Sequence, residues 1–437
     1  LLWSALAVAW SFRHEWPDRW RRVAPEGETG PPVSVLIPCF NEGPNLAETL
    51  RAALALCWSD WEVVAINDGS GDDTGQLLEH WASQEPRLRV VHLASNQGKA
   101  LALRAGALLA RHELLLCIDA DALLDRHAVG WLVRHFQHDP RLGAVTGNPR
   151  IRNRSTLLGR LQVGEFSMII GLIKRAQSQL GGLFCVSGVI GCFRRSALHA
   201  VGYWNPERLT EDIDVTWELQ RAGWRVRYEP HALIWILMPE TLQGLWRQRL
   251  RWAEGGLQVL RANLDLLWSP RQWRLLPLLL EPLASLAWAH LLAVLLLLAL
   301  MVTLASLLGL PQAWLPAGWV PAGMPPGAWL PLRELQPWHG LLVAAGLQGG
   351  AAPSADLLPH GLSLLLLLTC LLQFAVSFWL DRPYDQGLGR IAFWMVWYPA
   401  AYWLLTFLAT LRASWRLWRP GPQTRARWIS PDRGLRA

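Results

Sequence analysis

Short apolar runs alternate with longer, partly polar stretches along residues 31–150. The runs are VSVLI (33–37), EVVAI (62–66), RVVHL (89–93), LLLCI (114–118) and GAVTG (143–147), and helix-like segments separate most of them. Strands that are buried on both faces of a parallel sheet have this composition, because helices cover both sides of such a sheet. The pattern therefore predicts an α/β domain with a mostly parallel sheet.

Polar residues follow three of these runs. Asn41 and Glu42 come after the first run, Asp68 after the second, and Asp119 and Asp121 after the fourth. The carboxyl ends of parallel strands meet at one edge of the sheet, where ligands of α/β proteins bind. A plainer interpretation is that these residues only form turns and helix caps, which also require Asn, Asp and Gly.

The acidic pair Asp119 and Asp121 indicates a metal site. If extended geometry continues through Ala120, both carboxylates point to the same side of the strand. Two such charges repel each other unless a cation lies between them, and hard divalent ions prefer carboxylate oxygens alongside substrate phosphates. A helix cap after the strand is the alternative.

Apolar residues are concentrated in a second part of the chain. Residues 275–310, 361–380 and 391–411 carry very few charges, and each run is long enough to cross a hydrocarbon core, which takes about 20 residues. The whole chain is 52% apolar with a mean hydropathy of +0.17. We therefore expect a membrane protein with a water-soluble part. Residues 1–12 are apolar but too short to span, and we interpret them as the cut end of a transmembrane helix.

Charge predicts the side of the membrane but leaves the number of crossings open. Arg13, Arg19, Arg21 and Arg22 directly follow residues 1–12, and basic residues next to a span favour the cytoplasmic side. Three later crossings would place the end of the chain outside, yet residues 412–436 contain seven arginines. The formal net charge of +7 partly reflects such flanking arginines, so nucleic acid is not an expected partner.

The six cysteines lack C-x-x-C spacing, and most lie in apolar surroundings. We expect buried, reduced thiols in preference to disulfides or a zinc site.

Four motifs follow one another in order: Asp68, the D-x-D pair, Thr210-Glu211-Asp212, and Q-x-x-R-W with Gln248, Arg251 and Trp252. With the apolar runs behind them, they resemble the processive polysaccharide synthases of glycosyltransferase family 2. The stretches 145–175, 235–256 and 425–434 are similar, more closely, to the bacterial poly-β-1,6-N-acetyl-D-glucosamine synthases. The resemblance covers most of residues 31–265 and the tail, and it does not extend over residues 309–360.

The resemblance implies a fold and a division of the chain. It implies an α/β GT-A-type nucleotide-sugar-binding domain joined to an α-helical transmembrane region. The expected parts are a cytoplasmic catalytic domain (31–235), an amphipathic interfacial segment (236–272), a transmembrane region (273–411) with a Pro-, Gly- and Trp-rich loop (309–360), and a basic tail (412–437). In the interfacial segment, arginines are expected to face outward and Leu and Trp inward.

The resemblance also implies roles for individual residues. Asp119 and Asp121 would hold Mg²⁺ or Mn²⁺. The remaining donor-binding residues would be Asn41, Glu42, Asp68, Lys99, Gln248 and Arg251. Asp212 would be the general base, with a helix cap as the competing account. Glu211 and Trp252 would bind the acceptor, although a Trp at this place also suits packing at the membrane interface.

The implied activity is inverting, processive transfer of N-acetylglucosamine from UDP-GlcNAc to a β-1,6-linked polymer, coupled to export across the bacterial inner membrane for biofilm matrix. A small membrane partner protein is implied, and control by cyclic di-GMP is left open. Residues 31–265 do not state which sugar is used, so a hyaluronan-, chitin- or cellulose-type polymer or a lipid-linked product is an alternative. A transporter or nucleotide-binding regulator with a degenerate domain is disfavoured, because all four motifs are retained.

Overall fold

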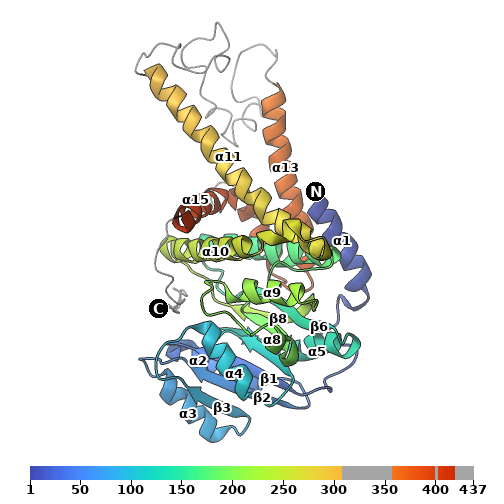
Figure 1. The fold of residues 1–437 in the computed structure, drawn as a ribbon. Coiled ribbons are helices and arrows are strands. Elements are labelled where there is room, and N and C mark those ends of the chain that lie inside the picture. The colour runs from blue at the N-terminus through green and yellow to red at the C-terminus, as the bar shows by residue number, and fades with distance from the viewer. Residues whose placement is uncertain (308–356, 399–401, 419–437) are drawn as a thin grey trace. The chain divides into compact units, whose positions relative to one another are not determined.

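The computed structural model describes the chain except residues 308–356, 399–401 and 419–437 (Figure 1). The chain divides into two compact units. The first comprises Leu1–Pro282 together with Phe374–Ala437, and the second comprises Leu283–Gln373. The predicted loop at 309–360 lies almost entirely outside the described residues.

Every strand expected from the apolar runs is present in the first unit. They are β1 (Val33–Cys39), β2 (Trp61–Asn67), β3 (Leu88–His92), β4 (Leu114–Ile118) and β6 (Leu142–Ile151). All residues of β1, β4 and β6 are buried. This burial on both faces is the reason that these strands appear in the sequence as continuous apolar runs.

Three further strands complete the sheet and were missed from the sequence. They are β5 (Leu123–Leu124), β7 (Ile190–Arg194) and β8 (Arg225–Ile236). The strand order of the eight-stranded sheet is β3-β2-β1-β4-β7-β6-β8-β5. The pairs β1–β2, β1–β4, β2–β3 and β6–β8 are parallel, whereas β4–β7, β6–β7 and β5–β8 are antiparallel. The sheet is thus mostly parallel, as expected, with β7 inserted in the opposite direction.

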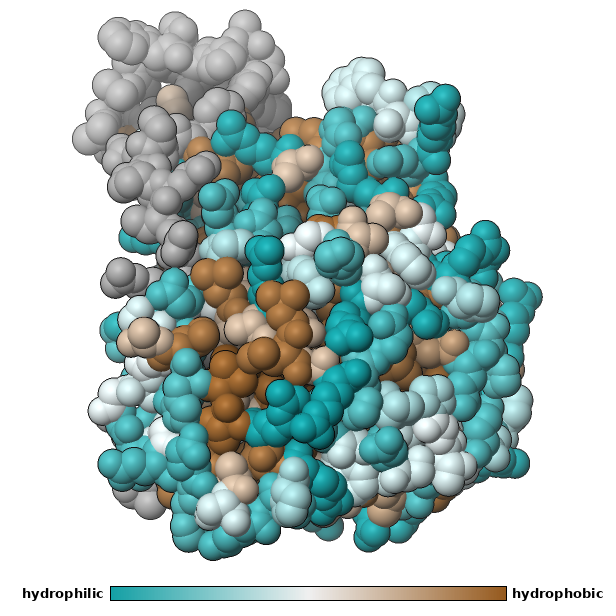
Figure 2. All heavy atoms as spheres, turned by 60° about the horizontal axis from the view of Figure 1, so that its bottom comes forward, coloured by the Kyte–Doolittle hydropathy of each residue, from teal (hydrophilic) through white to brown (hydrophobic). Residues whose placement is uncertain are grey.

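Helices connect the strands, and most of them begin near the carboxyl edge of the sheet. They are α2 (Gly43–Leu54), α3 (Thr74–Gln84), α4 (Lys99–Leu109), α5 (Ala128–His138) and α9 (Glu211–Arg221). Helix α8 (Arg195–Ala200) follows the antiparallel β7 and begins at the opposite edge, where the Arg195 N–H donates to the Glu113 carbonyl. Figure 2 shows the end of the molecule that lies at the bottom of Figure 1. Hydrophilic residues cover most of this face, and a cluster of apolar residues interrupts them.

A layer of helices lies beside this α/β part in the first unit. Its elements are α1 (Leu2–His14), η1 (Trp16–Asp18), α6 (Leu157–Phe166), the π-helix η2 (Ser167–Ile173), α7 (Lys174–Gln179), α10 (Leu242–Ala262), η3 (Leu264–Trp268), η4 (Pro270–Leu275), α14 (Leu388–Ile391), η6 (Ala392–Trp397) and α15 (Leu404–Trp418). A buried ion-pair chain connects distant segments of it. Arg175 pairs with Glu15 at 2.7 Å and with Asp381 at 2.9 Å.

The first residues of the chain form α1, which has one buried face. Ala7 packs in a cluster with Leu172, Ala176 and Leu380. Contacts with η2 and α7 therefore account for the apolar face of α1. The interpretation of residues 1–12 as the end of a transmembrane helix stays a prediction.

The described residues contain one helix that is long and apolar enough to cross a membrane, Pro270–Leu298. It includes most of α11 (Leu276–Leu307). The predicted span 361–380 lies in α13 (Leu357–Asp381), and within it Leu367–Asp381 is a shorter apolar helix.

The third predicted span, 391–411, includes the end of α14, η6 and the start of α15, and residues 399–401 lie outside the described residues. A membrane crossing by this segment stays a prediction. The buried Ala409 and Ala413 lie on α15, which packs against α10.

All six cysteines are free, as expected. Four of them are buried, Cys39, Cys117, Cys192 and Cys370.

Candidate active site

The loops that follow β1 and β2 are tied together at the carboxyl edge of the sheet. Asn41 adopts the left-handed conformation with φ of 55°. Its backbone N–H donates to Ser70 Oγ at 3.1 Å, and its side-chain Oδ1 accepts from the Gly71 N–H at 2.9 Å. The buried Glu42 donates its backbone N–H to Thr74 Oγ1 at 2.8 Å. Asn41 and Glu42 therefore shape this edge, and donor binding by them stays a prediction.

Asp68 organises the loop before α4. Its carboxylate is fully buried, and the two oxygens accept from the backbone N–H groups of Gln97 and Gly98, each at 2.8 Å. Burial raises the pKa of Asp68, although these two hydrogen bonds oppose the shift. Gly98 has a φ of 90°, which favours glycine. Asp68 thus fixes the turn that aims Lys99, the first residue of α4, along the edge.

Lys99 connects three segments of the site. Its Nζ donates to Asp119 Oδ1 at 2.5 Å and to the Gly188 carbonyl at 3.0 Å, and it lies 3.6 Å from Glu211 Oε1. Burial opposes the charge, but Asp119 and Glu211 outweigh burial and raise the pKa of Lys99. The side chain is therefore an ammonium group held among carboxylates.

The acidic pair is brought together by a turn and not by strand alternation. β4 ends at Ile118, and the Ala122 N–H donates to the Asp119 carbonyl at 3.2 Å. Burial, and then the neighbouring charge of Asp119, raise the pKa of Asp121 to about 7. Lys99 offsets part of the repulsion between the two carboxylates, and paired oxygen donors of this kind fit a hard divalent cation, which would favour the ionised form of both groups.

Asp212 lies in the first turn of α9 and reaches the loop before β7. Its Oδ2 accepts from the Gly188 N–H at 3.0 Å, and its Oδ1 accepts from the Ile213 N–H at 2.9 Å. The N-cap position belongs to Thr210. The helix-cap account of Asp212 is thus incomplete, since one oxygen contacts a first-turn N–H and the other contacts a different loop.

Two residues at this centre were missed from the sequence. A Cβ on Gly188 would lie 2.9 Å from Asp212 Oδ2 and 3.3 Å from Lys99 Nζ, so glycine is required by close approach. Lys174 is buried, and its Nζ donates to Thr146 Oγ1 at 3.1 Å. Burial lowers the pKa of Lys174 to about 8, although Cys185 and Asp212 favour its charged form. The Ser-Gly pair at 187–188 was the available signal for Gly188, whereas no local pattern indicates Lys174.

Helix α10 packs directly on the loop that precedes Glu211. Gly255 touches Thr210 so closely that a Cβ there would collide with the threonine side chain. Arg251 Nη1 donates to the Leu209 carbonyl at 3.3 Å, and Gln258 Oε1 accepts from the Leu209 N–H at 3.2 Å. The fold therefore brings the Q-x-x-R-W helix and the T-E-D loop together.

The charges of Lys99 and Arg251 both act on the carboxyl of Glu211. Burial raises its pKa, while Lys99 and Arg251 oppose the shift and Asp212 adds to it. Arg251 is itself exposed, so its guanidinium is accessible to a ligand at the edge of the cluster.

Gln248 and Trp252 lie one helical turn apart on α10 and so share a face. Gln248 Nε2 is 3.9 Å from Met238 Sδ, and its Oε1 is buried without a partner among the described residues. Trp252 is partly exposed, and the guanidinium carbon of Arg249 lies 4.3 Å from the centroid of its ring. These contacts do not join either side chain directly to the carboxylates.

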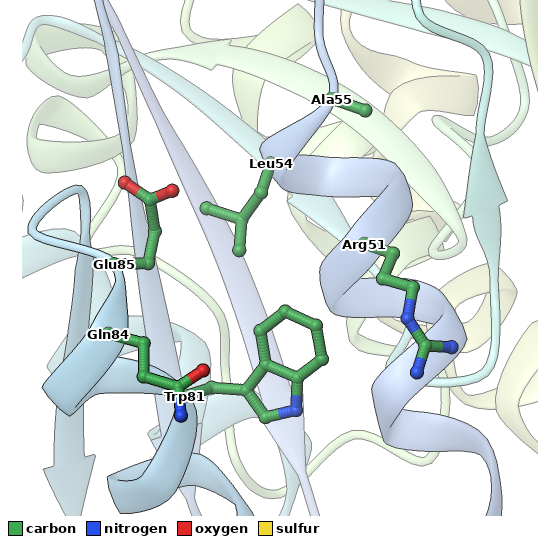
Figure 3. A pocket seen from close by; sticks show the side chains of 6 residues that line it. All are labelled: Arg51, Leu54, Ala55, Trp81, Gln84 and Glu85. Atoms are coloured by element: carbon green, nitrogen blue, oxygen red, sulfur yellow. The ribbon is translucent and has the colours of Figure 1, made fainter.

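A shallow depression elsewhere on the domain is lined by none of the predicted site residues (Figure 3). It lies at the carboxyl ends of α2 and α3 and is lined by Arg51, Leu54, Ala55, Trp81, Gln84 and Glu85. The Arg51 guanidinium lies 5.6 Å from the Trp81 ring centroid. Since these helices begin at the carboxyl edge of the sheet, the depression lies toward the opposite edge.

Proteins with similar sequences match this chain over most of its length. The chain is 32% identical over 435 residues to a poly-β-1,6-N-acetyl-D-glucosamine synthase of Staphylococcus epidermidis, which covers 99% of this chain and 95% of the relative. It is 33% identical over 402 residues to the synthase of Staphylococcus aureus (strain COL), covering 92% and 87%.

A solved structure shares the fold. The mannosyltransferase PcManGT from Pyrobaculum calidifontis, in complex with GDP-Man and Mn²⁺, matches with a TM-score of 0.53 and 21% identity, covering 96% of this chain and 99% of that one. The α/β domain is thus GT-A-like, as expected. Residues 31–255 match the family described as glycosyltransferase like family 2. The chain belongs to glycosyltransferase family 2 and is a nucleotide-sugar-dependent glycosyltransferase.

Proposed function

We propose that the chain is an inverting, processive synthase that transfers N-acetylglucosamine from UDP-GlcNAc to a growing β-1,6-linked poly-N-acetylglucosamine chain. The observation that carries this proposal is the gathering of Lys99, Asp119 and Asp212 around Gly188. The near full-length similarity to synthases named for that polymer supports the choice of sugar and linkage. Coupled export of the polymer across the bacterial inner membrane, for biofilm matrix, belongs to the same proposal.

Asp119 and Asp121 would hold Mg²⁺ or Mn²⁺ at the donor site. The oxygen donors and the raised pKa of Asp121 fit such an ion. When bound, the cation would neutralise charge on the diphosphate of the leaving UDP.

The other donor contacts would come from the loops around this pair. Lys99 and Arg251 would meet phosphate oxygens, because both are cationic and both act on the carboxyl of Glu211. Gln248 would offer its amide to the same group. Asn41, Glu42 and Asp68 would form the nucleoside side of the site.

Asp212 would act as the general base. Its carboxylate would take the proton from the acceptor hydroxyl as that oxygen attacks the anomeric carbon. The bond between this carbon and the phosphate oxygen then breaks, and UDP leaves with the electron pair. Attack from the face opposite the leaving group inverts the configuration. The Gly188 N–H, 3.0 Å from Oδ2, would keep the carboxylate oriented during this step.

The acceptor sugar would rest on Trp252, with Glu211 nearby. An aromatic ring suits the C–H face of a pyranose. The partial exposure of Trp252 is consistent with such a contact.

Exposed aromatic side chains on the helical layer support a bilayer location. They include Trp268, Trp273, Phe393, Trp403 and Trp415, and Trp is enriched at membrane interfaces. Together with the apolar helix Pro270–Leu298, they support membrane attachment. The proposed multi-pass topology rests on the apolar runs of the sequence, and the proposed cytoplasmic side of the catalytic domain rests on Arg13, Arg19, Arg21 and Arg22. A small membrane partner subunit, and cyclic di-GMP control, rest on the family resemblance alone.

The test uses membranes that contain the full chain, supplied separately with UDP-GlcNAc, UDP-glucose or UDP-glucuronate. We expect UDP release and polymer only with UDP-GlcNAc, and a product that is degraded by a β-1,6-specific hexosaminidase. Polymer from another donor would point to a different polysaccharide. UDP release with a short lipid-extractable product would point to a lipid-linked transferase.

A further inference from the structure

A buried ion pair lies directly beside the proposed acceptor platform. Arg249 Nη2 of α10 is 2.6 Å from Glu165 Oε2 of α6, and both side chains are almost fully buried. The sequence analysis expected the arginines of this helix to face outward, and Arg247 and Arg251 are indeed exposed. Arg249 therefore departs from the pattern of its neighbours.

The guanidinium of Arg249 contacts two aromatic rings. Its central carbon is 4.3 Å from the Trp252 ring centroid and 5.7 Å from that of Tyr402. Arg249 and Trp252 are three residues apart on one helix, which brings their side chains together. Tyr402 lies just before α15, which packs against α10 (Figure 1). One face of the indole is thus covered by a planar cation.

Glu165 fixes the orientation of that cation. It is the carboxylate paired with Arg249, whose Nε is buried without a partner among the described residues. Removing Glu165 would leave a buried, uncompensated charge, which is strongly unfavourable. A lysine could keep the charge pair but could not stack a planar group on the ring.

We propose that Arg249, held by Glu165, is a positioning residue that fixes Trp252 with one face covered and the other presented to the acceptor sugar. The proposal rests on the acceptor role of Trp252 stated above. It predicts that retention of the growing chain, and not the binding of UDP, depends on the Glu165–Arg249 pair.

The pair also gives chain retention a pH dependence. Burial raises the pKa of Glu165 to about 7, although Arg249 opposes the shift. Arg249 on α10 and the Tyr402 phenol are the titratable groups that face this carboxylate. The ion pair with Arg249 needs the ionised carboxylate of Glu165, so a fall in pH through about 7 weakens it. Product length should therefore shorten from pH 8 to pH 6, and Glu165→Gln should remove most of that dependence.

The experiment compares variants of the full chain in native membranes by product length, UDP release and UDP affinity. Arg249→Lys, Arg249→Met and Glu165→Gln should each shorten the product severalfold at pH 8 with UDP affinity unchanged. Arg247→Met, at an exposed arginine of the same helix, is the matched control and should leave product length as in the wild type.

A double-mutant cycle with Trp252→Ala separates the two proposals. If Arg249 acts through the indole, Arg249→Met should shorten the product no further once Trp252 is Ala. Full, independent shortening in that background would overturn the positioning role alone. Normal product length in Trp252→Ala would instead overturn the acceptor platform, and the positioning role with it. Joint loss of UDP affinity and thermal stability in Arg249→Lys and Glu165→Gln would mark the pair as structural only and would also overturn the proposal.

Discussion

Lys99 and Asp212 share one backbone residue: Lys99 donates to the carbonyl of Gly188 at 3.0 Å, and the N–H of Gly188 donates to Asp212 at 3.0 Å. The proposed phosphate-binding cation and the proposed base are therefore positioned by the same peptide segment. A shift of that segment would move both groups at once.

Gly188→Ala should lower transfer on the order of 10²-fold, because displacements near 1 Å at a catalytic centre have effects of that size. The added Cβ would lie 2.9 Å from Asp212 Oδ2. The measurement is the initial rate of UDP release. Gly256→Ala is the control, since a Cβ there meets nothing within 4 Å, and it should stabilise α10 by roughly 0.5–1 kcal/mol without loss of rate. Wild-type rates in Gly188→Ala would contradict the shared positioning.

Asp212→Asn should lower turnover by about 10²-fold or more, which is the usual scale of a lost general base. UDP-sugar binding should remain nearly intact, because the donor contacts come from other segments. Calorimetric titration of UDP beside single-turnover rates measures both quantities. An equal loss of binding and rate would instead identify Asp212 as a residue that holds the 188 loop.

Asp119→Asn or Asp121→Asn should abolish transfer and weaken metal-dependent UDP binding. One carboxylate cannot hold a divalent ion against a diphosphate as two do. UDP affinity is measured with Mg²⁺, with Mn²⁺ and with EDTA. Full activity of the wild type in EDTA would rule out the metal site.

Lys174→Met should stabilise the fold at neutral pH and reduce transfer. Burial lowers the pKa of Lys174 to about 8, whereas an unfolded lysine has a pKa of about 10.4. Below pH 8 Lys174 is protonated in both the folded and the unfolded chain. Burial of its charge then lowers the free energy of unfolding by its full amount, about 3 kcal/mol at most. Between pH 8 and about pH 10.4 the unfolded chain binds more protons, so the wild type gains stability as pH rises.

Thermal unfolding of the Lys174→Met variant and the wild type at pH 7 and pH 10 tests this linkage. The stability gain of Lys174→Met should be largest at pH 7 and small at pH 10. A variant less stable than the wild type at pH 7 would show that the hydrogen bond of Lys174 to Thr146, 3.1 Å long, outweighs the burial of its charge.

Trp252→Ala should collapse polymer synthesis to short products while leaving UDP affinity nearly unchanged. Hydrolysis of the UDP-sugar should continue, since water needs no aromatic platform. Product length, UDP affinity and thermal midpoint are compared in one preparation. Parallel losses of stability and UDP binding would assign Trp252 to packing at the membrane interface.

The local sequence determined five strands and one edge of the sheet. Apart from the buried Ser34, the residues of β1 and β4 are nonpolar, so both strands could be recognised from the sequence alone. Parallel strands end at a common edge, and therefore Asp68 and Asp119 could be placed together from their positions after two runs. The similarity of the motifs to family 2 enzymes added the roles proposed for these residues.

Tertiary structure decided what depends on contacts between distant segments. β7 was not apparent as a strand because it enters the sheet against the direction of β4 and β6 after a long helical excursion. Arg249 looked like its exposed neighbours, and only Glu165, 84 positions earlier, makes its burial favourable. Gly188 and Lys174 carry no local signal of their neighbours. The periodicity of apolar residues indicates which face of a helix or strand is buried. It does not indicate which segment packs on that face, because that depends on tertiary contacts between residues far apart in the sequence.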